Sequence, residues 1–425
     1  MLDIELFRKN PQVVVDSQKR RGQPVELVEE VTRLDEKWRE YLQQAEKLKH
    51  ERNVISENIN RLKKAGKSAD AEIKQMKDFV ENLKEIDQKA QTTKMMRDKV
   101  LLEIPNILDK RVPAGKSDED NKIIRVWGKI PKFKFKPKDH IDLGLTLDLF
   151  DVDKAAGFSG ARFYFLKNKA VLLNQALARY AIDFLVKEGH TPLMPPNLIR
   201  GKVLQGAGYF PGGEQDAYKI ENEDLYLIGT SEQIICAFHS GETLKENELP
   251  KKYAGYSPCY RTEAGSHGRD TKGIFRVHQF EKVEQVRITT PEMSEKAHQE
   301  MIGLAEKLFK SLGISYHVVI NCTADIGYAP AAMKYDLEAW LPGQNKYREM
   351  VSCSNCTDYQ ARRLGVRVLR KNGKIEVAHI LNSTAFAIER TMIAIMENFQ
   401  QADGSIKIPK VLWKYTGFRE IRAKK

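Results

Sequence analysis

Apolar residues recur with helical spacing through the first hundred residues. Between Val25 and Leu62 they alternate in steps of four and three, broken only at Arg52, and most intervening positions are charged. A second pattern of the same kind runs from Ala71 to Met96, after the polar break KKAGKSAD. Two such helices joined by a short glycine-containing turn are predicted to form an antiparallel hairpin. At about 1.5 Å per residue, helices of about 38 residues make an arm on the order of 55 Å long.

A dimerising or scaffolding coiled coil is the alternative interpretation of this repeat. The turn favours a self-contained hairpin, because each helix then has its partner in the same chain. The outer faces are rich in lysine and arginine, but a charge-rich helix face is ordinarily just solvated. The pattern alone therefore predicts the hairpin and leaves its partner open.

The chain changes character after the helical region. The segment from Ile104 to Lys138 carries four prolines and short apolar pieces such as IIRVWG, which predicts a linker that leads into a second domain. A helical pattern then runs from Leu166 to Lys187 and ends at Gly189. The following HTPLMPP predicts a short strand that stops at proline.

The stretch from Tyr260 to Glu284 predicts an antiparallel hairpin whose loop is the polar, glycine-rich AGSHGRDTKG. Arg261 and Glu263 would share one face of a strand, and Phe280 and Glu284 would share a face further on. A fixed guanidinium suits a phosphate and an aromatic face suits a purine, so we expect a nucleotide pocket beside a carboxylate that binds an ammonium group. The alternative is an ordinary surface hairpin of mixed charge.

The composition limits the number of domains, the kinds of partner and the location that these patterns allow. The 425 residues, 41% of them hydrophobic, suffice for two or three globular domains. A net charge of +12 favours a polyanionic partner, although charge alone is weak evidence of nucleic-acid binding. No apolar run approaches the roughly 18 residues of a membrane span, and the start MLDIELFRKNP lacks the order of a signal peptide, so we expect a cytoplasmic protein.

The five cysteines are an odd number in a long chain, which argues against a disulfide framework. Cys353 and Cys356 form a CxxC, which could be half of a zinc site. No second CxxC or suitably spaced pair of histidines follows, so no structural zinc is expected, and redox chemistry is less favoured still.

The string from Tyr260 to Glu284 resembles motif 2 of the class II aminoacyl-tRNA synthetases, in the form RxEAGxxGRDTxGxxRxHQFxKVE found in seryl-tRNA synthetases. The resemblance extends to TSE at 230–232, REMVSCSNCTDYQARR at 348–363 and LNSTAFAIERTMIAIMENFQ at 381–400, and it covers essentially the whole chain. HTPLMPP resembles motif 1, with Pro196 at the position of its proline. The implied fold is α+β, with a helical-hairpin tRNA-binding arm at 1–105 and a class II catalytic domain, an antiparallel sheet flanked by helices, at 106–425.

The resemblance implies a two-step reaction: ATP activates L-serine as seryl-adenylate, and the seryl group then passes to the 3′ end of tRNA(Ser). It leaves tRNA(Sec) open as a second acceptor. Motif 1 implies a homodimer, and the reaction implies Mg²⁺ bound with ATP. Such chemistry depends on positioning and charge stabilisation more than on a protein nucleophile.

The implied site residues fall into four groups. Arg261, Arg390 and Glu349 are the expected catalytic residues. Those expected to bind ATP are Arg261, Thr262, Glu263, Arg276, Val277, Phe280, Glu349, Met350, Val351, Ser352 and Arg390, with Glu349 and Ser352 also holding Mg²⁺. Those expected to line the serine site are Thr230, Ser231, Glu232, Glu284 and Thr384. Those expected to contact tRNA phosphates are Lys47, Lys49, Arg52, Arg61, Lys63 and Lys64.

Three positions depart from the family pattern. Val351 replaces a serine, residues 383–385 replace Gly-Ser-Gly, and Glu389 replaces a glycine before Arg390, with which it could pair. Two other functions remain open: a scaffold whose synthetase-like domain is inert, and a paralogue that charges a carrier protein. The first is expected to lose Arg261, Glu284 or Arg390, and the second to lack the arm, whereas this chain keeps all of them.

Overall fold

The computed structural model describes residues 1–265, 268 and 270–423. The chain divides into two compact units, Leu2–Ile107 and a second unit made of Met1 and the chain from Leu108 onward. The first unit is helical and the second combines a large sheet with helices, so the predicted α+β class is confirmed. Residues 266, 267 and 269 of the predicted hairpin loop lie outside the described residues.

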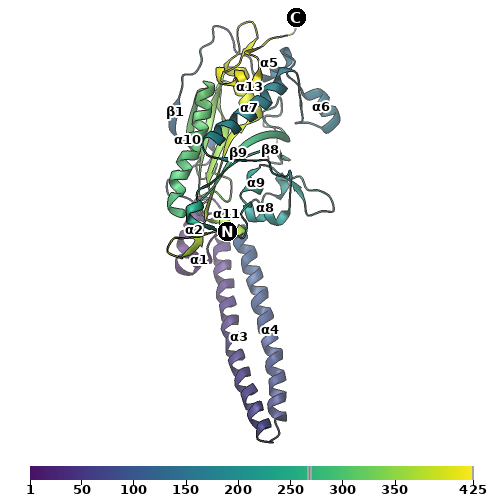
Figure 1. Ribbon diagram of the computed structural model, residues 1–425, viewed down its shortest axis with the longest axis vertical. Helices are drawn as coiled ribbons and strands as arrows, with labels where there is room; N and C mark the ends of the chain where they lie inside the picture. Colours follow the sequence, from purple (N-terminus) through teal and green to yellow (C-terminus); the bar gives the residue numbers. More distant parts are fainter. Residues whose placement is uncertain (266–267, 269, 424–425) are drawn as a thin grey trace. The chain divides into compact units, whose positions relative to one another are not determined.

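The helical unit contains the predicted hairpin (Figure 1). Two short helices, α1 (Ile4–Lys9) and α2 (Pro11–Arg20), precede α3 (Glu26–Lys64) and α4 (Asp70–Glu103), which run side by side. Their 39 and 34 residues correspond to lengths of about 58 and 51 Å. α4 extends seven residues beyond the predicted Met96 and ends at Glu103, because Pro105 disfavours helical backbone at the residue before it.

Apolar and ionic contacts both join α3 to α4. Along the hairpin, Ala45 packs with Leu83 and Ile86. Further toward the chain's start, Asp35 is buried, and Arg97 of α4 donates to its Oδ1 at 2.7 Å. Hydrogen bonds from Arg8 at 2.8 and 2.9 Å and from Arg39 at 3.2 Å complete the cluster. Burial opposes ionisation of Asp35, but Arg8 and Arg97 outweigh it and hold its pKa below the ordinary value.

An eight-stranded sheet forms the second unit, in the order β1-β10-β11-β12-β15-β9-β8-β4. Neighbouring strands are antiparallel except β4 and β8, which are parallel. The strands are β1 (Lys122–Trp127), β4 (Thr191–Leu193), β8 (Lys251–Tyr260), β9 (Gln279–Thr289), β10 (Tyr316–Ile320), β11 (Met333–Leu341), β12 (Lys346–Asn355) and β15 (His379–Ala387). β1 is thus an edge strand of the sheet, although its sequence was assigned to the linker.

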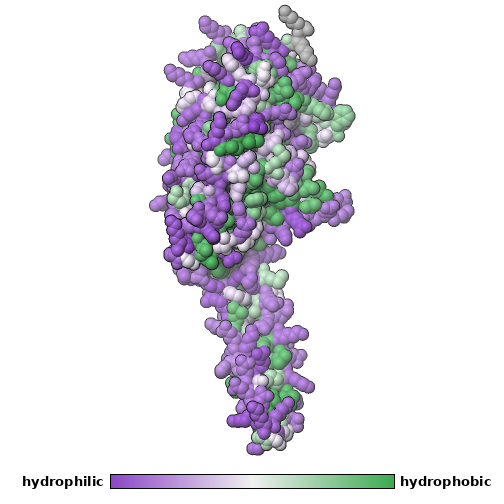
Figure 2. Space-filling view, in the orientation of Figure 1, coloured by the Kyte–Doolittle hydropathy of each residue, from purple (hydrophilic) through white to green (hydrophobic). Residues whose placement is uncertain are grey.

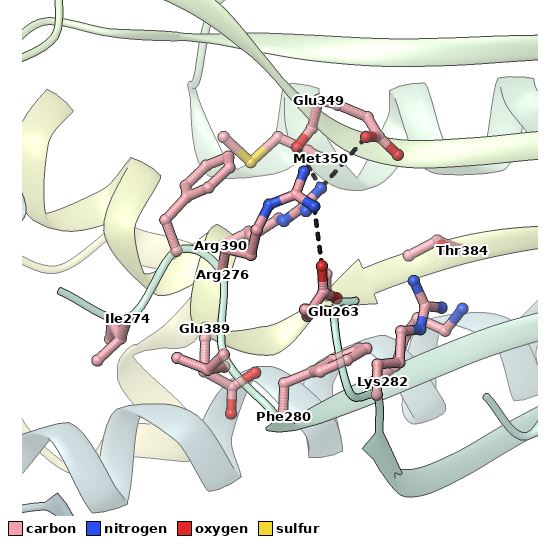
Figure 3. A pocket seen from close by; sticks show the side chains of 14 residues that line it. Glu263, Ile274, Arg276, Phe280, Lys282, Glu349, Met350, Thr384, Glu389 and Arg390 are labelled. Carbon is pink, nitrogen blue, oxygen red and sulfur yellow. Dashed lines mark hydrogen bonds and ion pairs between the residues drawn. The ribbon is translucent and has the colours of Figure 1, made fainter. Parts of the chain in front are cut away.

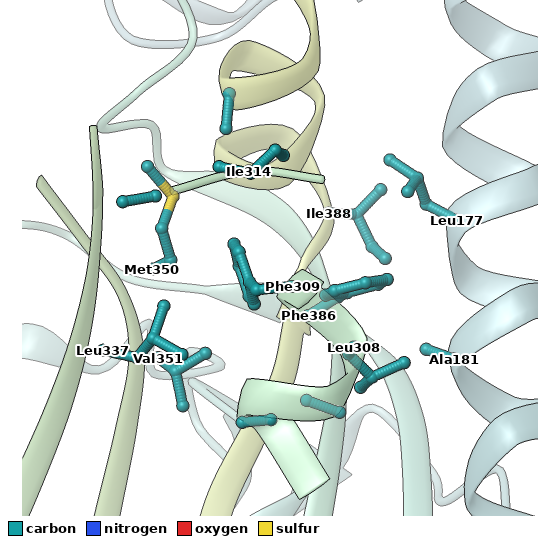
Figure 4. Close-up of a cluster of buried hydrophobic side chains, with 14 of the residues drawn as sticks. Leu177, Ala181, Leu308, Phe309, Ile314, Leu337, Met350, Val351, Phe386 and Ile388 are labelled. Atoms are coloured by element: carbon teal, nitrogen blue, oxygen red, sulfur yellow. The ribbon is translucent and has the colours of Figure 1, made fainter. Parts of the chain in front are cut away.

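Helices cover one face of this sheet. The cluster in Figure 4 joins Leu177 of α7 (Lys169–Lys187), Phe309 of α10 (Ser294–Leu312) and Ile388 of α12 (Ile388–Asn398) to the sheet residues Val351 and Phe386. Shorter helices complete the unit: α5 (His140–Thr146), α6 (Val152–Ser159), α8 (Gly201–Ala207), α9 (Glu232–Ile235), α11 (Tyr359–Leu364) and α13 (Trp413–Thr416). Short strands form small separate sheets: β2 (Phe150–Asp151), β3 (Phe165–Leu166), β5 (Leu198–Ile199), β6 (Tyr226–Leu227), β7 (Thr243–Lys245), β13 (Arg367–Leu369), β14 (Ile375–Val377), β16 (Ile406–Lys407) and β17 (Glu420–Ile421).

Alternation along β9 separates the core from the other face of the sheet. Val283 belongs to the core, and the Gln285 amide donates to the Met301 carbonyl of α10 at 3.3 Å. Phe280 and Glu284 share the opposite face, as predicted for residues an even number apart. The predicted hairpin of β8 and β9 is confirmed.

None of the helices within the described residues combines the length and apolarity that crossing a bilayer requires.

Candidate active site

A cavity of about 190 Å³ opens on the face of the sheet opposite to α10 (Figure 3). Its walls come from the connection between β8 and β9, from β9, β12 and β15, and from the start of α12. The lining residues are Arg261, Glu263, Ile274, Phe275, Arg276, Val277, Phe280, Lys282, Glu349, Met350, Thr384, Ala387, Glu389 and Arg390. Residues separated by more than a hundred positions in the sequence therefore share one cavity.

Arg261 follows directly on the last residue of β8. Its Nε donates to the Gly229 carbonyl at 3.1 Å, and its guanidinium lies over the Phe280 ring at 5.2 Å. Glu263 has a φ of 54°, so the predicted strand alternation does not extend to it. Both residues nevertheless line the same cavity.

Two further arginines in the cavity are already paired with carboxylates (Figure 3). Arg276 donates to Glu263 at 2.8 Å, and Arg390 lies 3.4 Å from the Glu349 carboxylate and donates to the Glu349 carbonyl at 3.0 Å. Burial opposes the ionisation of Glu349, but Arg390 and neighbouring cations lower its pKa below the ordinary value. These carboxylates keep the guanidiniums in place for an anionic ligand.

Phe275 was not recognised from the sequence. The Arg348 and Arg390 guanidiniums lie 3.8 and 4.7 Å from the centre of its ring. The ring therefore restricts the movement of Arg390 through cation–π contact. Only its place beside Arg276 in the loop could have drawn attention to it.

A β-bulge in β12 brings Glu349 and Ser352 to one face. Val351 lies opposite Leu337 and Glu349 lies opposite Glu338, so Met350 is an extra residue on β12. A spacing of three would otherwise put Glu349 and Ser352 on opposite faces. The Val351 side chain is fully buried in the core (Figure 4), so only its backbone can face a ligand.

The predicted serine residues form a buried polar cluster next to this cavity. Glu284 is 1% exposed, forms an ion pair with Lys282 at 2.6 Å and accepts from the Thr384 hydroxyl at 3.3 Å. Burial raises the pKa of Glu284, and Lys282 only partly offsets this effect. Of the five predicted serine residues, Thr384 lines the cavity itself. Lys282 was missed, although it lies two positions before Glu284 and so shares its face.

Glu232 is held by four hydrogen bonds. It accepts from the Tyr209 hydroxyl at 2.9 Å, the Tyr328 hydroxyl at 2.6 Å, Gln360 at 3.1 Å and Asn382 at 3.0 Å. Its four partners come from separate parts of the sequence, which no local pattern could have indicated.

Thr230 and Ser231 are also buried. The Thr230 hydroxyl accepts from the Glu232 amide at 3.3 Å, and the Ser231 hydroxyl donates to the Gly255 carbonyl at 3.4 Å. The Thr230 hydroxyl therefore supports the backbone at Glu232, and the Ser231 hydroxyl joins this segment to β8.

Glu389 does not pair with Arg390, contrary to the hypothesis from the sequence. Its carboxylate accepts from the Tyr164 hydroxyl at 2.6 Å and from the Glu281 amide at 3.0 and 3.2 Å. Figure 3 shows it on the Phe280 side of the cavity, away from Glu349. Burial raises its pKa to about 7.

The strand that replaces Gly-Ser-Gly also contains a bulge. Thr384 lies opposite Glu284 and Phe386 lies opposite Val283, so Ala385 is the extra residue on β15. Ala385 is buried in the core, and the Ser383 hydroxyl donates to the Thr384 carbonyl at 3.1 Å. The bulge thus keeps the Thr384 hydroxyl on the cavity side.

A second cavity of about 500 Å³ shares Phe275, Arg276, Glu349 and Arg390 with the first. Its other walls are mostly charged and include Asp325, Asp336 and Lys334. Burial raises the pKa of Asp336, and the Lys334 ammonium 3.4 Å away only partly offsets this.

No cluster of three or more histidine, cysteine or acidic side chains suited to a metal occurs among the residues that the structure describes. Cys353 and Cys356 are both buried, and Cys356 accepts from the Asn382 amide at 3.6 Å.

The six predicted tRNA contacts lie along α3 in the helical unit. Five are exposed, whereas Arg52 is half-buried and donates to Asn53 at 3.1 Å. Lys49 lies 3.6 Å from Asp87 of α4. Figure 2 shows a largely hydrophilic surface on the hairpin, with scattered hydrophobic areas. Val54 and Val80 are exposed apolar side chains of α3 and α4.

Comparison with known proteins covers both units. The family "Seryl-tRNA synthetase N-terminal domain" matches residues 1–108, and "tRNA synthetase class II core domain (G, H, P, S and T)" matches residues 217–399. The serine–tRNA ligase of Pyrococcus horikoshii is 45% identical, over 99% of this chain and 97% of its own length. That of Nitrosopumilus maritimus is 44% identical, over 98% of this chain and 99% of its own length.

Two solved structures are similar over the full chain. The seryl-tRNA synthetase of Pyrococcus horikoshii complexed with ATP superposes with a TM-score of 0.96 at 44% identity, covering 100% of both chains. The cytoplasmic serine–tRNA ligase of Naegleria fowleri in complex with AMP gives 0.91 at 37% identity, covering 100% of this chain and 99% of the other. By sequence and by structure, the chain belongs to the seryl-tRNA synthetase family.

Proposed function

We propose that this protein uses ATP to activate L-serine as seryl-adenylate and transfers the seryl group to the 3′ end of tRNA(Ser). The observation that carries the proposal is one cavity in which three arginines and an aromatic ring lie beside the buried Lys282–Glu284–Thr384 cluster. A nucleotide and an amino acid can meet there.

ATP would bind through charge and stacking. The position of Arg261 over the Phe280 ring supports a role at the α-phosphate, next to a base stacked on Phe280. Arg276 would leave Glu263 for the far phosphates, and Glu263 would then be available to the adenine amino group. Arg390, steadied by Phe275, would cover the other face of the base.

The donor set fits a magnesium ion that arrives with ATP. Glu349 supplies a carboxylate whose pKa is lowered, and the bulge at Met350 puts the Ser352 hydroxyl on the same face. Oxygen ligands suit this ion. When bound, it would neutralise phosphate oxygens, while Arg261 stabilises the charge that develops as the serine carboxylate attacks the α-phosphorus.

Glu284 would bind the serine ammonium group, and Thr384 would meet its hydroxyl. A site that leaves buried polar groups unpaired when the hydroxyl is missing can reject alanine by about 10⁴. Threonine would be rejected for lack of room, since Thr384 brings a methyl group into the cavity wall.

The helical hairpin would bind tRNA through the six cationic residues on α3, and its charge-rich surface supports contacts with phosphates. The sequence resemblance also makes tRNA(Sec) a second candidate acceptor. For an enzyme of translation we further propose a cytoplasmic location, which imaging of a tagged protein would test.

We also propose that the protein is a homodimer. The region that resembles motif 1 leaves apolar side chains exposed on α7 and just after β4, with Leu172 48%, Val186 44% and Met194 77% exposed. Such side chains favour burial against a second copy. Light scattering coupled to size exclusion should give twice the chain mass.

Serine-dependent exchange of pyrophosphate into ATP, followed by transfer of labelled serine to total tRNA, tests the function. We expect both steps for the native protein, and we expect Arg422→Ala, which alters an exposed arginine, to behave like it. Binding without exchange would indicate a scaffold. Exchange with transfer only to a carrier protein would indicate the paralogue, and either result would overturn the proposal.

A further inference from the structure

A row of five lysines lies between β1 and α5, outside every residue group discussed above. The segment 129–138 reads KIPKFKFKPK, and no acidic residue occurs from Val126 to Lys138. We call Lys129, Lys132, Lys134, Lys136 and Lys138 the lysine ridge. Its members are all exposed, whereas Pro131, Phe133, Phe135 and Pro137 between them are half-buried.

The half-buried residues direct the lysines outward. The Phe133 and Phe135 rings contact each other edge to face at 5.1 Å. Lys138 joins the end of the segment to the rest of the catalytic unit. Its backbone amide donates to the side-chain oxygen of Gln400 at 2.8 Å, and its carbonyl accepts from the side-chain nitrogen of Gln400 at 2.8 Å. Hydrogen bonds therefore fix the backbone at the Lys138 end of the ridge.

The lysine ridge is not neutralised by the protein. Among the described residues, none of its five ammonium groups has a carboxylate within 4.0 Å or a hydrogen-bond acceptor. By contrast, Lys49 on the hairpin lies near Asp87. The five charges are spread over the ten residues 129–138, so the row presents separate point charges suited to a polyanion and not to a single ion.

The end of the ridge packs against two connections of the catalytic unit. Its last residue precedes Asp139 and His140. A Cβ placed on Gly343 would lie 2.4 Å from the Asp139 Cα, so the β11–β12 turn packs there. A Cβ on Gly273 would lie 2.3 Å from the His140 Nε2, so the β8–β9 loop packs there as well.

These two connections lead directly to the cavity. The β8–β9 loop carries Arg276, and the β11–β12 turn leads through Arg348 to Glu349. The ridge thus ends against the two segments that supply these cavity residues, which suits a polyanion whose end enters the cavity. Only one of the proposed substrates is a long polyanion whose terminus must enter that cavity.

We propose that the lysine ridge binds the phosphate backbone of the tRNA acceptor stem and guides the 3′ end toward the active site. This inference rests on the proposed function and adds a second RNA-binding surface to the one on the hairpin. Lysine contacts to phosphates position the RNA without selecting its sequence.

The test replaces all five ridge lysines with glutamine (K129Q, K132Q, K134Q, K136Q and K138Q together). A matched control replaces five other exposed lysines in the same unit with glutamine: Lys202, Lys296, Lys310, Lys371 and Lys407. Both variants lose five positive charges. The probes are full-length tRNA(Ser) and an acceptor-stem minihelix that lacks the long variable arm.

We expect the ridge variant to bind tRNA at least tenfold more weakly, with a shallower salt dependence, since each lost phosphate contact reduces the slope of log K against log salt by about 0.7 to 0.9. Seryl transfer to the minihelix should fall further than transfer to full-length tRNA, because the minihelix lacks the hairpin contacts. Serine-dependent pyrophosphate exchange should remain normal in both variants.

Equal effects of ridge and control variants would overturn the proposal, since they would reflect net charge alone. Unchanged RNA binding together with lost binding to phosphatidylserine vesicles would assign the ridge to membranes instead and would equally overturn it. Absent pyrophosphate exchange by the native protein would refute the proposed function, and the RNA-binding comparison would still decide the role of the ridge.

Discussion

Replacing Glu389 with glutamine should make the stability of the catalytic unit less dependent on pH. Glu389 is 2% exposed, and burial raises its pKa from the ordinary 4.5 to about 7. Because the folded state binds the proton more tightly than the unfolded chain, the native protein loses stability as pH rises from about 4.5 to about 7. Glutamine does not titrate, so the variant keeps this part of its free energy of unfolding as pH rises.

The displacement of the pKa gives the size of the effect. A difference of about 2.5 pKa units at about 1.4 kcal/mol each amounts to about 3 to 4 kcal/mol. For a unit of this length, that corresponds to roughly 5 °C in melting temperature. The melting temperature of Glu389→Gln minus that of the native protein should therefore increase by about this amount between pH 5 and pH 8.

The same substitution should weaken ATP binding. Both carboxylate oxygens accept from the Glu281 amide, next to Phe280, and a carboxamide offers only one acceptor oxygen. Loss of one such hydrogen bond at about 1 kcal/mol predicts a roughly fivefold higher KM for ATP. The kcat should change little, since Arg261 and Glu349 are untouched.

Melting curves across pH and pyrophosphate-exchange kinetics measure both effects. Glu223→Gln, at an exposed glutamate, is the matched control and should show the pH profile of the native protein. Parallel profiles for Glu389→Gln and the native protein would refute the assignment of a buried carboxylate with a raised pKa. A fall in kcat without a change in KM would refute the positioning of Phe280 through Glu281.

Four further predictions follow from the described contacts. Arg261→Ala should lower pyrophosphate exchange by roughly 10² to 10³ in a folded protein, and near-normal exchange would contradict its role at the α-phosphate. Asp35→Ala should destabilise the helical unit by about 1 to 3 kcal/mol in denaturant titrations, because the buried Arg97 loses one of its two carboxylate partners. The pKa of Asp35 is lowered, so the native contribution should be present near neutral pH and lost as pH falls below about 4, and an unchanged acid transition in the variant would count against this ion cluster. Replacing residues 26–103 by a short flexible linker should preserve serine activation but sharply reduce aminoacylation of tRNA(Ser). Normal aminoacylation by this variant would favour a scaffold role for the hairpin. Alanine and threonine should support far less exchange than serine, and equal stimulation by all three would refute the proposed specificity.

Local periodicity was enough for the elements whose contacts lie close in sequence. The seam of the hairpin repeats within each helix, so α3 was predicted to within two residues at each end. The end of α4 was not, because the apolar repeat is interrupted by the buried Arg97. Arg97 pairs with the adjacent Asp98 and also with Asp35, 62 positions away, and nothing near Arg97 indicates this second partner.

The sequence by itself determined the helical hairpin, the β8–β9 hairpin and the membership in the family, because periodicity and motif strings are local properties. Only the tertiary structure decided how the motifs combine. The bulges at Met350 and Ala385 choose which side chains face the cavity, and they depend on strand register. The partners of Glu389 and Glu232 come from distant segments, since a buried carboxylate takes whatever donors the packed chain brings within reach.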